Sequence, residues 1–319
     1  MSINYEEELP RASSLAARLE ALSAKARAKA VTTKNSEAPK IAPTNVPRAT
    51  CSEEFREVPN IALRSALFGA IGKGKRRYLE REMIYTQKNT SIIYTGVQLD
   101  QGDLDVWETI LHIVRTQPLG QDCCISTYKL LQLLGNSDTG ANRKVLKRRL
   151  SRLSASALDV KIGYHTYYEG SLINEILRDE NNGRSIIRLN PHLSKMFESD
   201  QFTRINWQVR QSLKGKFLAQ WLHGYYSSHA TPYPVRIQTL HQLSGSNSVH
   251  QSKFRQQLSK ALSTLREVCN AHGQPFNYQF EDGLVRIEKT PSNAQSRHIA
   301  KRKSGNLRPQ MLDDYRRNG

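Results

Sequence analysis

One segment of the sequence nearly matches a nucleotide-binding loop. Gly69-Ala-Ile-Gly-Lys-Gly-Lys75 fits the first seven positions of G-x-x-x-x-G-K-[ST], but Arg76 stands where a Ser or Thr would hold magnesium. The preceding segment, Ile61–Phe68, is not a clear parallel strand, and no apolar run ends in an Asp that could serve the metal. We therefore expect no nucleotide site. The segment is better interpreted as a basic loop suited to phosphates, formed by Lys73, Lys75, Arg76 and Arg77.

The residues needed for covalent or metal chemistry do not occur at useful spacings. Nicking enzymes combine a tyrosine with a His-hydrophobe-His metal pair, and no H-x-H occurs although tyrosines are plentiful, as at Tyr164, Tyr167 and Tyr168. We interpret this Tyr-rich stretch as β-strand packing in a wing. The four cysteines form no C-x-x-C pair, and the nine histidines lack ligand spacing. We expect a non-enzymatic protein with reduced thiols and no metal or cofactor; the cysteines are Cys51, Cys123, Cys124 and Cys269.

Charge is the strongest clue in the composition. The chain has 319 residues, with 47 Lys and Arg against 29 Asp and Glu, which gives a net charge of +18 and a pI near 9.9. Such an excess favours a polyanionic partner, because binding releases condensed counterions from DNA. No run of about 20 apolar residues occurs, and the acidic start MSINYEEEL is followed by no apolar run, so we expect a cytoplasmic protein. A ribosomal protein, a membrane-surface protein or a basic tail on another domain would share this charge.

The placement of charge on two helices separates these alternatives. A helix predicted at Asn142–Ser156 has Leu146, Leu150 and Leu153 as its apolar stripe. Its opposite face carries cations and a hydroxyl without an acid, whereas an ordinary solvated helix mixes both signs. We predict that this face binds DNA through Lys144, Lys147, Arg148, Ser151 and Arg152.

A second predicted helix, capped by Ser248, is chemically different. Its apolar stripe is Phe254, Leu258, Leu262 and Leu265. Arg and Gln can form paired hydrogen bonds with guanine and adenine edges, while Ser and Lys more often hold phosphates. We predict base reading by this helix. Its exposed face carries Ser252, Lys253, Arg255, Gln256, Ser259, Lys260, Ser263 and Arg266, and all of these except Ser263 are predicted to bind DNA.

These two helices occupy equivalent places in an internal repeat. In the first half, a helix starting at Asp103 is followed by a short helix with Ser126 or Thr127 as its N-cap, which ends at Gly135. The basic helix comes next, and then β-like segments over Leu158–Gly163, Leu172–Arg178 and Ser185–Leu189 with an Asn-Asn-Gly turn. We expect this hairpin to touch the DNA backbone through Arg178 and Arg184.

The second half repeats this order. A helix around Phe217–Tyr225 precedes a short one at Thr239–Leu243 that ends at Gly245, then the long helix, then a hairpin with an Asp282-Gly283 turn. QLLGNS at Gln132–Ser137 parallels QLSGSN at Gln242–Asn247. Helix, short helix, turn, longer helix and hairpin is the winged form of helix-turn-helix. A helical repeat protein would not place β-rich segments after every third helix.

The sequence thus predicts an α+β, helix-rich protein with two tandem winged-helix domains and disordered N- and C-terminal tails. The expected divisions are a short helix and a flexible Pro-containing linker over 1–55, winged-helix domain 1 over 56–200, winged-helix domain 2 over 201–290, and a basic tail over 291–319.

Several strings resemble the TrfA family of replication initiators from broad-host-range bacterial plasmids. Val58-Pro-Asn-Ile-Ala-Leu-Arg-Ser-Ala-Leu-Phe68 is the most specific, and the likeness continues through Asp103-x-Asp-Val-Trp107, the QLLG turn and Lys216-x-x-x-x-Trp-Leu-His223, covering about 55 to 290. The resemblance implies an initiator, active as a monomer and also found as a homodimer. It implies binding to repeated origin sites (iterons), opening of nearby duplex, and recruitment of host initiator, replicative helicase and sliding clamp.

Two points remain open at the level of sequence. A clamp-binding peptide of the form Gln-Leu-x-Leu-Phe is expected in the family, and Gln98-Leu99-Asp100 preserves only its start. A winged-helix transcriptional repressor would use the same helices, and a DNA-processing enzyme is the other rival.

Overall fold

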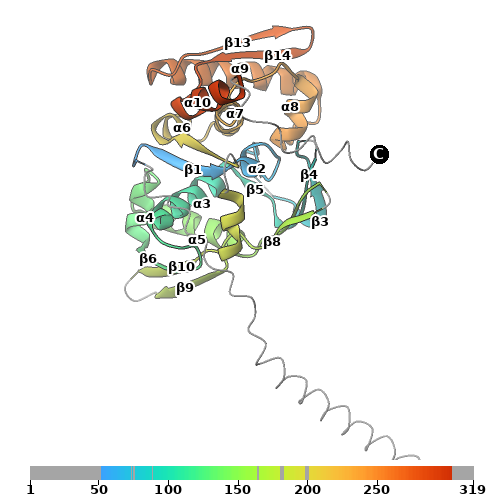
Figure 1. Cartoon of the computed structure of the whole chain (residues 1–319). Helices are drawn as coiled ribbons and strands as arrows, with labels where there is room; N and C mark the ends of the chain where they lie inside the picture. The colour runs from blue at the N-terminus through green and yellow to red at the C-terminus, as the bar shows by residue number, and fades with distance from the viewer. Residues whose placement is uncertain are drawn as a thin grey trace, which may run out of the picture. The chain divides into compact units, whose positions relative to one another are not determined.

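The computed structural model describes residues 52–72, 74, 76–87, 89–163, 165–179, 183–197 and 201–303. They form a mixed α and β structure (Figure 1). The predicted N-terminal helix and linker, and the end of the basic tail from residue 304, lie outside the described residues. Up to residue 197 the elements are β1 (Phe55–Pro59), α2 (Asn60–Leu63), β2 (Phe68–Gly69), β3 (Tyr78–Ile84), β4 (Thr90–Val97), β5 (Leu99–Asp100), α3 (Gln101–Ile113), η1 (Val114–Thr116), β6 (Asp122–Ser126), α4 (Thr127–Leu133), α5 (Gly140–Ser154), β7 (Ala157–Ile162), β8 (His165–Gly170), β9 (Glu175–Asp179), β10 (Arg184–Arg188) and η2 (Pro191–Phe197).

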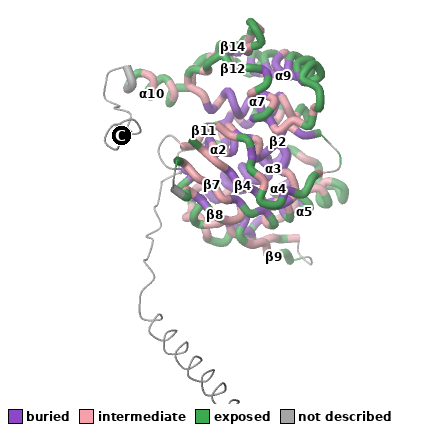
Figure 2. The backbone as a smooth tube through the Cα atoms, turned by 90° about the vertical axis from the view of Figure 1, so that its right-hand side faces the viewer, coloured by how far each residue is buried: buried purple, intermediate pink, exposed green. Residues whose placement is uncertain are grey.

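The later elements follow the same pattern of short strands and longer helices. They are β11 (Phe202–Asn206), α6 (Trp207–Ser212), α7 (Phe217–Ser227), β12 (Val235–Arg236), α8 (Ile237–Ser244), α9 (Gln251–Ala271), β13 (Phe276–Glu281), β14 (Leu284–Lys289) and α10 (Asn293–Lys303). Buried apolar side chains form two clusters, one from Val58 to Trp207 and one from Val209 to Ile287. In Figure 2 the buried stretches run through α3 and α7, while the outer turns of α9 and the strand β9 are exposed.

The first core is organised by α3, which starts earlier than predicted. Asp100 is its N-cap and accepts from the Asp103 amide, while the Asp103 side chain accepts from the Asp100 amide. This capping box places Asp103 at the third helical position instead of the first. Trp107 is buried and stacks on Phe68 with ring centroids 5.7 Å apart. The helix therefore runs through the centre of the first core.

The short helix, turn and basic helix of the first half form as predicted. Ser126 is the N-cap of α4, because its hydroxyl accepts from the Lys129 amide. After the turn, α5 buries Leu146, Leu150 and Leu153, the three residues of the predicted stripe. Strands β9 and β10 pair as an antiparallel hairpin, and β10 pairs on its other side with β6.

Part of the strand prediction for the first half is wrong. Leu158–Gly163 does not belong to the hairpin, because β7 lies in a separate four-stranded sheet of order β3-β4-β7-β8. Strands β3 and β4 were missed. The Tyr-rich stretch is edge strand β8 of that sheet and not part of a wing: Tyr168 is buried and donates to the Ser171 carbonyl. Local alternation identifies a strand but not its partners, which are set by tertiary packing.

The second core matches the predicted order. Helices α7, α8 and α9 are followed by the β13–β14 hairpin, whose two-residue turn, Asp282-Gly283, has positive φ at both positions. The start of α9 differs from the prediction. His250 is its N-cap, without a side-chain capping bond, and the Ser248 hydroxyl instead donates to Gln257 Oε1 at 3.0 Å.

The repeated QL-x-G motif ends two different helices in the same way. Gly135 follows α4 with φ +63° and Gly245 follows α8 with φ +58°, both in the left-handed region. A Cβ at Gly135 would lie 2.8 Å from Gln211 Oε1, and one at Gly245 would lie 3.1 Å from the Ala66 Cβ. Each glycine is therefore required by its φ and by a close neighbour.

We expect Gly245→Ala to lower the free energy of unfolding by about 1–2 kcal/mol, because an L side chain is disfavoured in the left-handed region. Urea unfolding would measure the change. Gly140→Ala is the matched control, since Gly140 starts α5 without a positive φ and a Cβ there would meet nothing within 4 Å. If both variants were equally stable, the proposed requirement at Gly245 would be wrong.

The family-like string Val58–Phe68 lies along the seam between the two cores. Leu63 packs so close to Gly224 of α7 that a Cβ there would lie 2.9 Å from it. The Trp221 indole donates to the Ser65 carbonyl, and the Ala70 amide donates to the Ser244 carbonyl. Strand β1 also pairs antiparallel with β11. This string thus holds the second core against the first.

A buried polar network crosses the same seam. Arg210 of α6 is 1% exposed; its Nε donates to Asp105 Oδ1 at 2.7 Å and lies 2.5 Å from Glu108 Oε1. Gln220 of α7 donates to Asp105 Oδ2. Burial raises the pKa of Glu108, and the neighbouring guanidinium opposes this shift. Two carboxylates of α3 therefore share the buried guanidinium of Arg210, which comes from the second half of the chain.

The predicted C-terminal tail contains a helix, which corrects the expectation of disorder from residue 291. Ser292 and Gln295 cap the start of α10. The Gln295 amide donates to Ser292 Oγ, and the Ser292 amide donates to Gln295 Oε1. Gln295 Nε2 also donates to the Ser227 carbonyl at 2.7 Å. The signal was present in the sequence as Ser-x-x-Gln, a capping box.

Candidate nucleic-acid interface

The exposed face of α5 keeps most of its predicted cations. Lys144, Lys147, Arg148 and Ser151 are exposed on the side opposite the buried leucines. No acidic residue lies within α5. Just before the helix, Asp138 is engaged by Arg143, which contacts both of its carboxylate oxygens at 2.6 Å. The α5 face is therefore basic, as the sequence predicts.

Arg152 does not belong to this face. Its guanidinium contacts both oxygens of the fully buried Asp103, with Nη2 to Oδ1 at 2.6 Å and Nε to Oδ2 at 3.2 Å. The prediction of DNA contact by Arg152 is therefore wrong. A helical wheel assigns each side chain to one helix face, but it cannot show that a buried carboxylate of α3 lies within reach. The long side chain turns back to pair with it.

The predicted face of α9 is exposed along most of its length. Lys253, Arg255, Gln256, Ser259 and Lys260 are exposed, as is Arg266 further along. Two of the arginines contact aromatic rings of the β13–β14 hairpin. Arg255 Cζ lies 5.8 Å from the Phe280 ring centre, and Arg266 Cζ lies 5.5 Å from the Tyr278 ring centre. The hairpin therefore restrains these guanidinium groups through cation–π contacts. Sequence reasoning missed both aromatic partners.

The basic loop before β3 is only partly available for binding. Arg76 pairs with Asp100, the N-cap of α3, and its side chain is 16% exposed, so its predicted role as a free backbone contact is wrong. Arg77 is exposed and pairs with Glu82. Lys73 and Lys75 lie outside the described residues. Gly69 lies in β2 and the chain leads on to β3, an arrangement unlike a phosphate loop that opens a helix.

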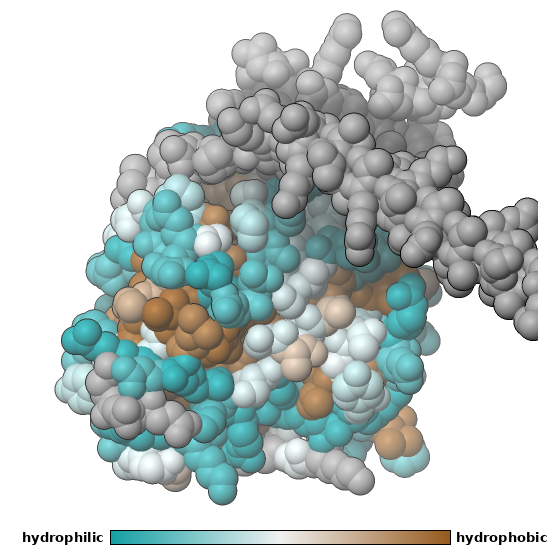
Figure 3. Space-filling view, turned by 90° about the horizontal axis from the view of Figure 1, so that it is seen from below, coloured by the Kyte–Doolittle hydropathy of each residue, from teal (hydrophilic) through white to brown (hydrophobic). Residues whose placement is uncertain are grey.

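The β9–β10 hairpin places its two arginines on opposite faces. Arg184 pairs in register with Asp179, and Arg178 with Ser185, so that the two side chains alternate across the sheet. Both are exposed. Leu177 is 50% exposed and lies in one cross-strand row with Ile186 and Cys124. Figure 3 shows the molecule from below, the side of this hairpin, where apolar residues reach the surface among hydrophilic ones.

The β13–β14 hairpin differs in charge. Its turn carries Glu281 and Asp282, and Arg286 pairs with Glu281 at 3.2 Å. An acidic turn is unfavourable beside phosphates. The tip of this hairpin is therefore poorly suited to contact the DNA backbone. Strand β13 has another role, because its aromatic rings restrain the α9 arginines.

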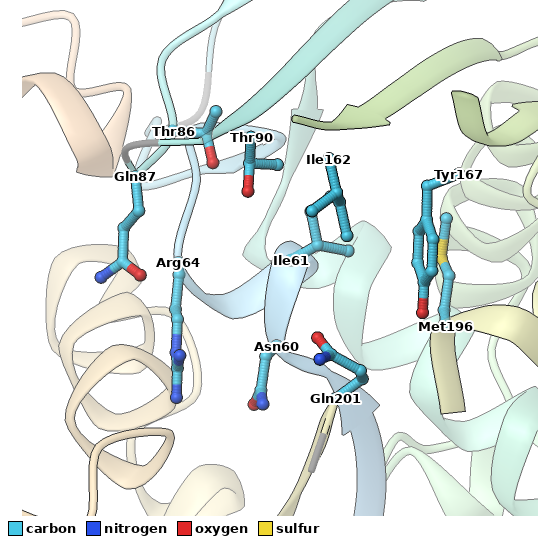
Figure 4. Close-up of a pocket in the computed structure, with 10 residues that line it drawn as sticks. All are labelled: Asn60, Ile61, Arg64, Thr86, Gln87, Thr90, Ile162, Tyr167, Met196 and Gln201. Atoms are coloured by element: carbon cyan, nitrogen blue, oxygen red, sulfur yellow. The ribbon is translucent and has the colours of Figure 1, made fainter. Parts of the chain in front are cut away.

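A small cavity of about 80 Å³ lies beside α2 (Figure 4). Two polar side chains that line it reach the end of α7: Arg64 Nε donates to Ser228 Oγ at 2.8 Å, and Gln87 Nε2 lies 3.1 Å from His229 Nε2. Burial lowers the pKa of His229 to about 4, so this histidine is neutral at physiological pH. The cavity is therefore lined by residues that precede the second core in sequence, two of which contact the end of α7.

The described part of the chain bears on metal and membrane sites as well. There, no group of three or more His, Cys, Asp and Glu side chains is placed to hold a metal ion. None of the described helices combines the length and apolar character required to cross a bilayer.

Comparison with known proteins agrees with the sequence. The family model for TrfA protein matches residues 21–282. The plasmid replication initiator protein TrfA of Escherichia coli is 30% identical over 221 residues, which cover 67% of this chain and 57% of that protein. Among solved structures, domains 2 and 3 of RctB have a TM-score of 0.49 at 12% identity, covering 69% of this chain and 93% of that one. The Pi initiator in complex with iteron DNA has a TM-score of 0.42 at 12% identity, covering 59% and 91%. The match to the family model extends over most of the sequence, and the chain therefore belongs to the TrfA family.

Proposed function

We propose that this protein is a plasmid replication initiator that binds repeated duplex sites at an origin through two winged-helix domains. The observation that carries this proposal is the pair of exposed basic helices, α5 and α9, each of which follows a short helix and a turn at a left-handed glycine. A helix of this kind fits the major groove, which is about 12 Å wide. The family relationship supports the same function.

The two cores support the proposed division into domains. The first cluster ends at Trp207 and the second begins at Val209, close to the expected boundary between 200 and 201. In this proposal β9 and β10 are the wing of the first domain, and β13 and β14 that of the second. The DNA-binding residues would be Lys144, Lys147, Arg148, Ser151, Ser252, Lys253, Arg255, Gln256, Ser259, Lys260 and Arg266, with Arg77, Arg178 and Arg184 at the backbone.

The host partners of this initiator are proposed from the family resemblance. They are the host initiator, the replicative helicase and the sliding clamp, with a homodimer as a second oligomeric form. Clamp binding through Gln98-Leu99-Asp100 is not supported, because Leu99 is 2% exposed and Asp100 caps α3. Any clamp contact would therefore use another segment. We propose no enzymatic step and a cytoplasmic location.

Footprinting on the DNA that flanks the gene tests the function. An initiator of this family is expected to protect a ladder of direct repeats. A single protected palindrome at a promoter would indicate a repressor, and Mg²⁺-dependent strand cleavage of the same DNA would indicate a processing enzyme. Either of these outcomes would overturn the proposal.

The two helices are expected to respond differently to substitution. Arg255→Ala should cost about 1–3 kcal/mol of binding free energy and relax the preference at one base pair, because arginine reads guanine edges. Lys147→Ala should weaken cognate and random duplex alike and reduce the salt slope by about one. Titration of both variants against the cognate site, single-base variants and random duplex would measure this.

Arg297→Ala serves as the control, because Arg297 is an exposed cation of α10 outside both faces. It should leave base preference unchanged. If Arg255→Ala weakened all duplexes equally while Lys147→Ala changed base preference, the assignment of base reading to α9 would be reversed. Phe280→Leu should weaken the same preference in part, because it removes the ring beneath Arg255.

A further inference from the structure

A large groove lies beside α9, on the flank away from the aromatic strand β13. Its volume is about 870 Å³, within the range of sites that hold ligands. It is bounded by one stripe of α9, the start of α7, the loop between α8 and α9, and the segment Ala70–Gly72. We name it the α7–α9 groove.

The floor and rim of the α7–α9 groove are apolar over much of their extent. The apolar residues come from all four boundaries, and Val249 at the rim is 87% exposed. Val249 is exposed, and Ala70, Phe217 and Leu218 are half-buried, whereas the other apolar lining residues are already buried. A partner in the groove therefore removes the remaining apolar area of these four from water, and each square ångström contributes about 25 cal/mol. The apolar lining residues are Ala70, Ile71, Phe217, Leu218, Ala219, Val249 and Ala261.

The charges around this groove are all positive. Lys216, Lys253 and Lys260 line it and are exposed, and no Asp or Glu does. Within the described part of the chain none of the three lysines forms an ion pair. The first turns of α7 and α9 also lie at the groove, and neither helix has a side-chain cap, so their amides add to the positive potential.

We propose that the α7–α9 groove binds an acidic, amphipathic peptide segment of a partner protein. The lysines complement carboxylates, and the apolar floor takes the peptide's apolar side chains. A DNA backbone fits less well, because it brings charge but no apolar group to bury. Lys253 and Lys260 also belong to the proposed DNA face, so the peptide and duplex DNA compete. This competition rests on the proposed function, whereas peptide binding itself does not.

Binding can be measured without DNA by fluorescence anisotropy, using the full chain and a labelled twelve-residue peptide that alternates Glu with Leu and Phe. Replacing Leu and Phe by Ser should weaken binding at least tenfold, and replacing Glu by Lys should abolish it. Lys216→Glu and Val249→Asp should each weaken binding of the parent peptide tenfold or more. Lys144→Glu is the matched control: it makes the same charge change on α5 and should have little effect. Thermal unfolding would confirm that the variants are folded.

Three outcomes would overturn the proposal. Equal binding of the Ser-substituted peptide, or equal weakening by Lys144→Glu, would indicate general attraction to a basic protein. If Val249→Asp weakened duplex DNA binding but not peptide binding, the groove would be part of the DNA interface instead. A failure of DNA binding with intact peptide binding would overturn the proposed function but leave the groove assignment standing.

Discussion

Raising the salt concentration from about 50 to about 200 mM is expected to weaken binding to duplex DNA by roughly a thousandfold or more. The two helix faces expose seven of the predicted cations, namely Lys144, Lys147, Arg148, Lys253, Arg255, Lys260 and Arg266. Each phosphate that they neutralise releases condensed counterions, and the free energy of this release falls as bulk salt rises. A titration of the affinity for the cognate duplex at several salt concentrations would give the slope of log K against log[salt].

A nearly flat slope would contradict the proposed DNA contacts, even if the protein bound DNA. The double variant Lys144→Ala/Lys147→Ala provides an internal check. It should reduce the slope by about two, because each lysine is assigned to one phosphate. A substitution of the exposed Arg297, outside both faces, should leave the slope unchanged.

Arg210→Met is expected to lower the free energy of unfolding by about 3–5 kcal/mol, the largest effect on stability that we predict. The variant removes the cation that lies between Asp105 and Glu108, and leaves two carboxylates at the seam without their charge partner. Glu108 is fully buried, and its Oε1 lies 2.5 Å from Arg210 Nε. Urea unfolding monitored by tryptophan fluorescence would report the loss.

Two further variants make this measurement specific. Arg286→Ala breaks an exposed pair with Glu281 and should change stability by less than about 1 kcal/mol. Combining Arg210→Met with Asp105→Leu and Glu108→Leu should recover part of the loss, because no buried charge is then left unpaired. A loss below about 1 kcal/mol for Arg210→Met alone would show that the seam does not depend on this pair.

The elements that sequence predicted best are those whose signals are local. The left-handed stops at Gly135 and Gly245, the Asp282-Gly283 turn and the leucine stripe of α5 all depend on residues within a few positions of one another. The four-stranded sheet was missed because the pairing of β4 with β7 joins residues far apart in sequence, and β3 joins the sheet only through β4. The helix α10 could have been predicted from its Ser292–Gln295 capping box.

The sequence was sufficient to predict which helix faces carry exposed cations. It was not sufficient to predict which of these side chains form ion pairs or ring contacts within the protein. Sequence places cations on the exposed faces of α5 and α9, and the structure agrees for most of them. It could not reveal that Arg152 pairs with Asp103, or Arg76 with Asp100, since both partners are buried acids of the first core. Nor could it reveal the rings beneath Arg255 and Arg266, which depend on how the hairpin packs against α9.

The α6–α7 connection has a consequence for modularity. Lys214 Nζ donates to the carbonyls of Leu134 and Gly135 and to Asn136 Oδ1. A residue just before α7 therefore stabilises the turn between α4 and α5 in the first half. Arg210, four residues earlier, lies in α6 and contacts α3 of the first half as well. If the two halves are the proposed DNA-binding domains, their exchange between relatives needs its crossover after Lys214, near Lys216, and not at the boundary near 200. A chimera joined there keeps the Lys214 contacts within the first half, and under the proposed function its new site preference would come from α9.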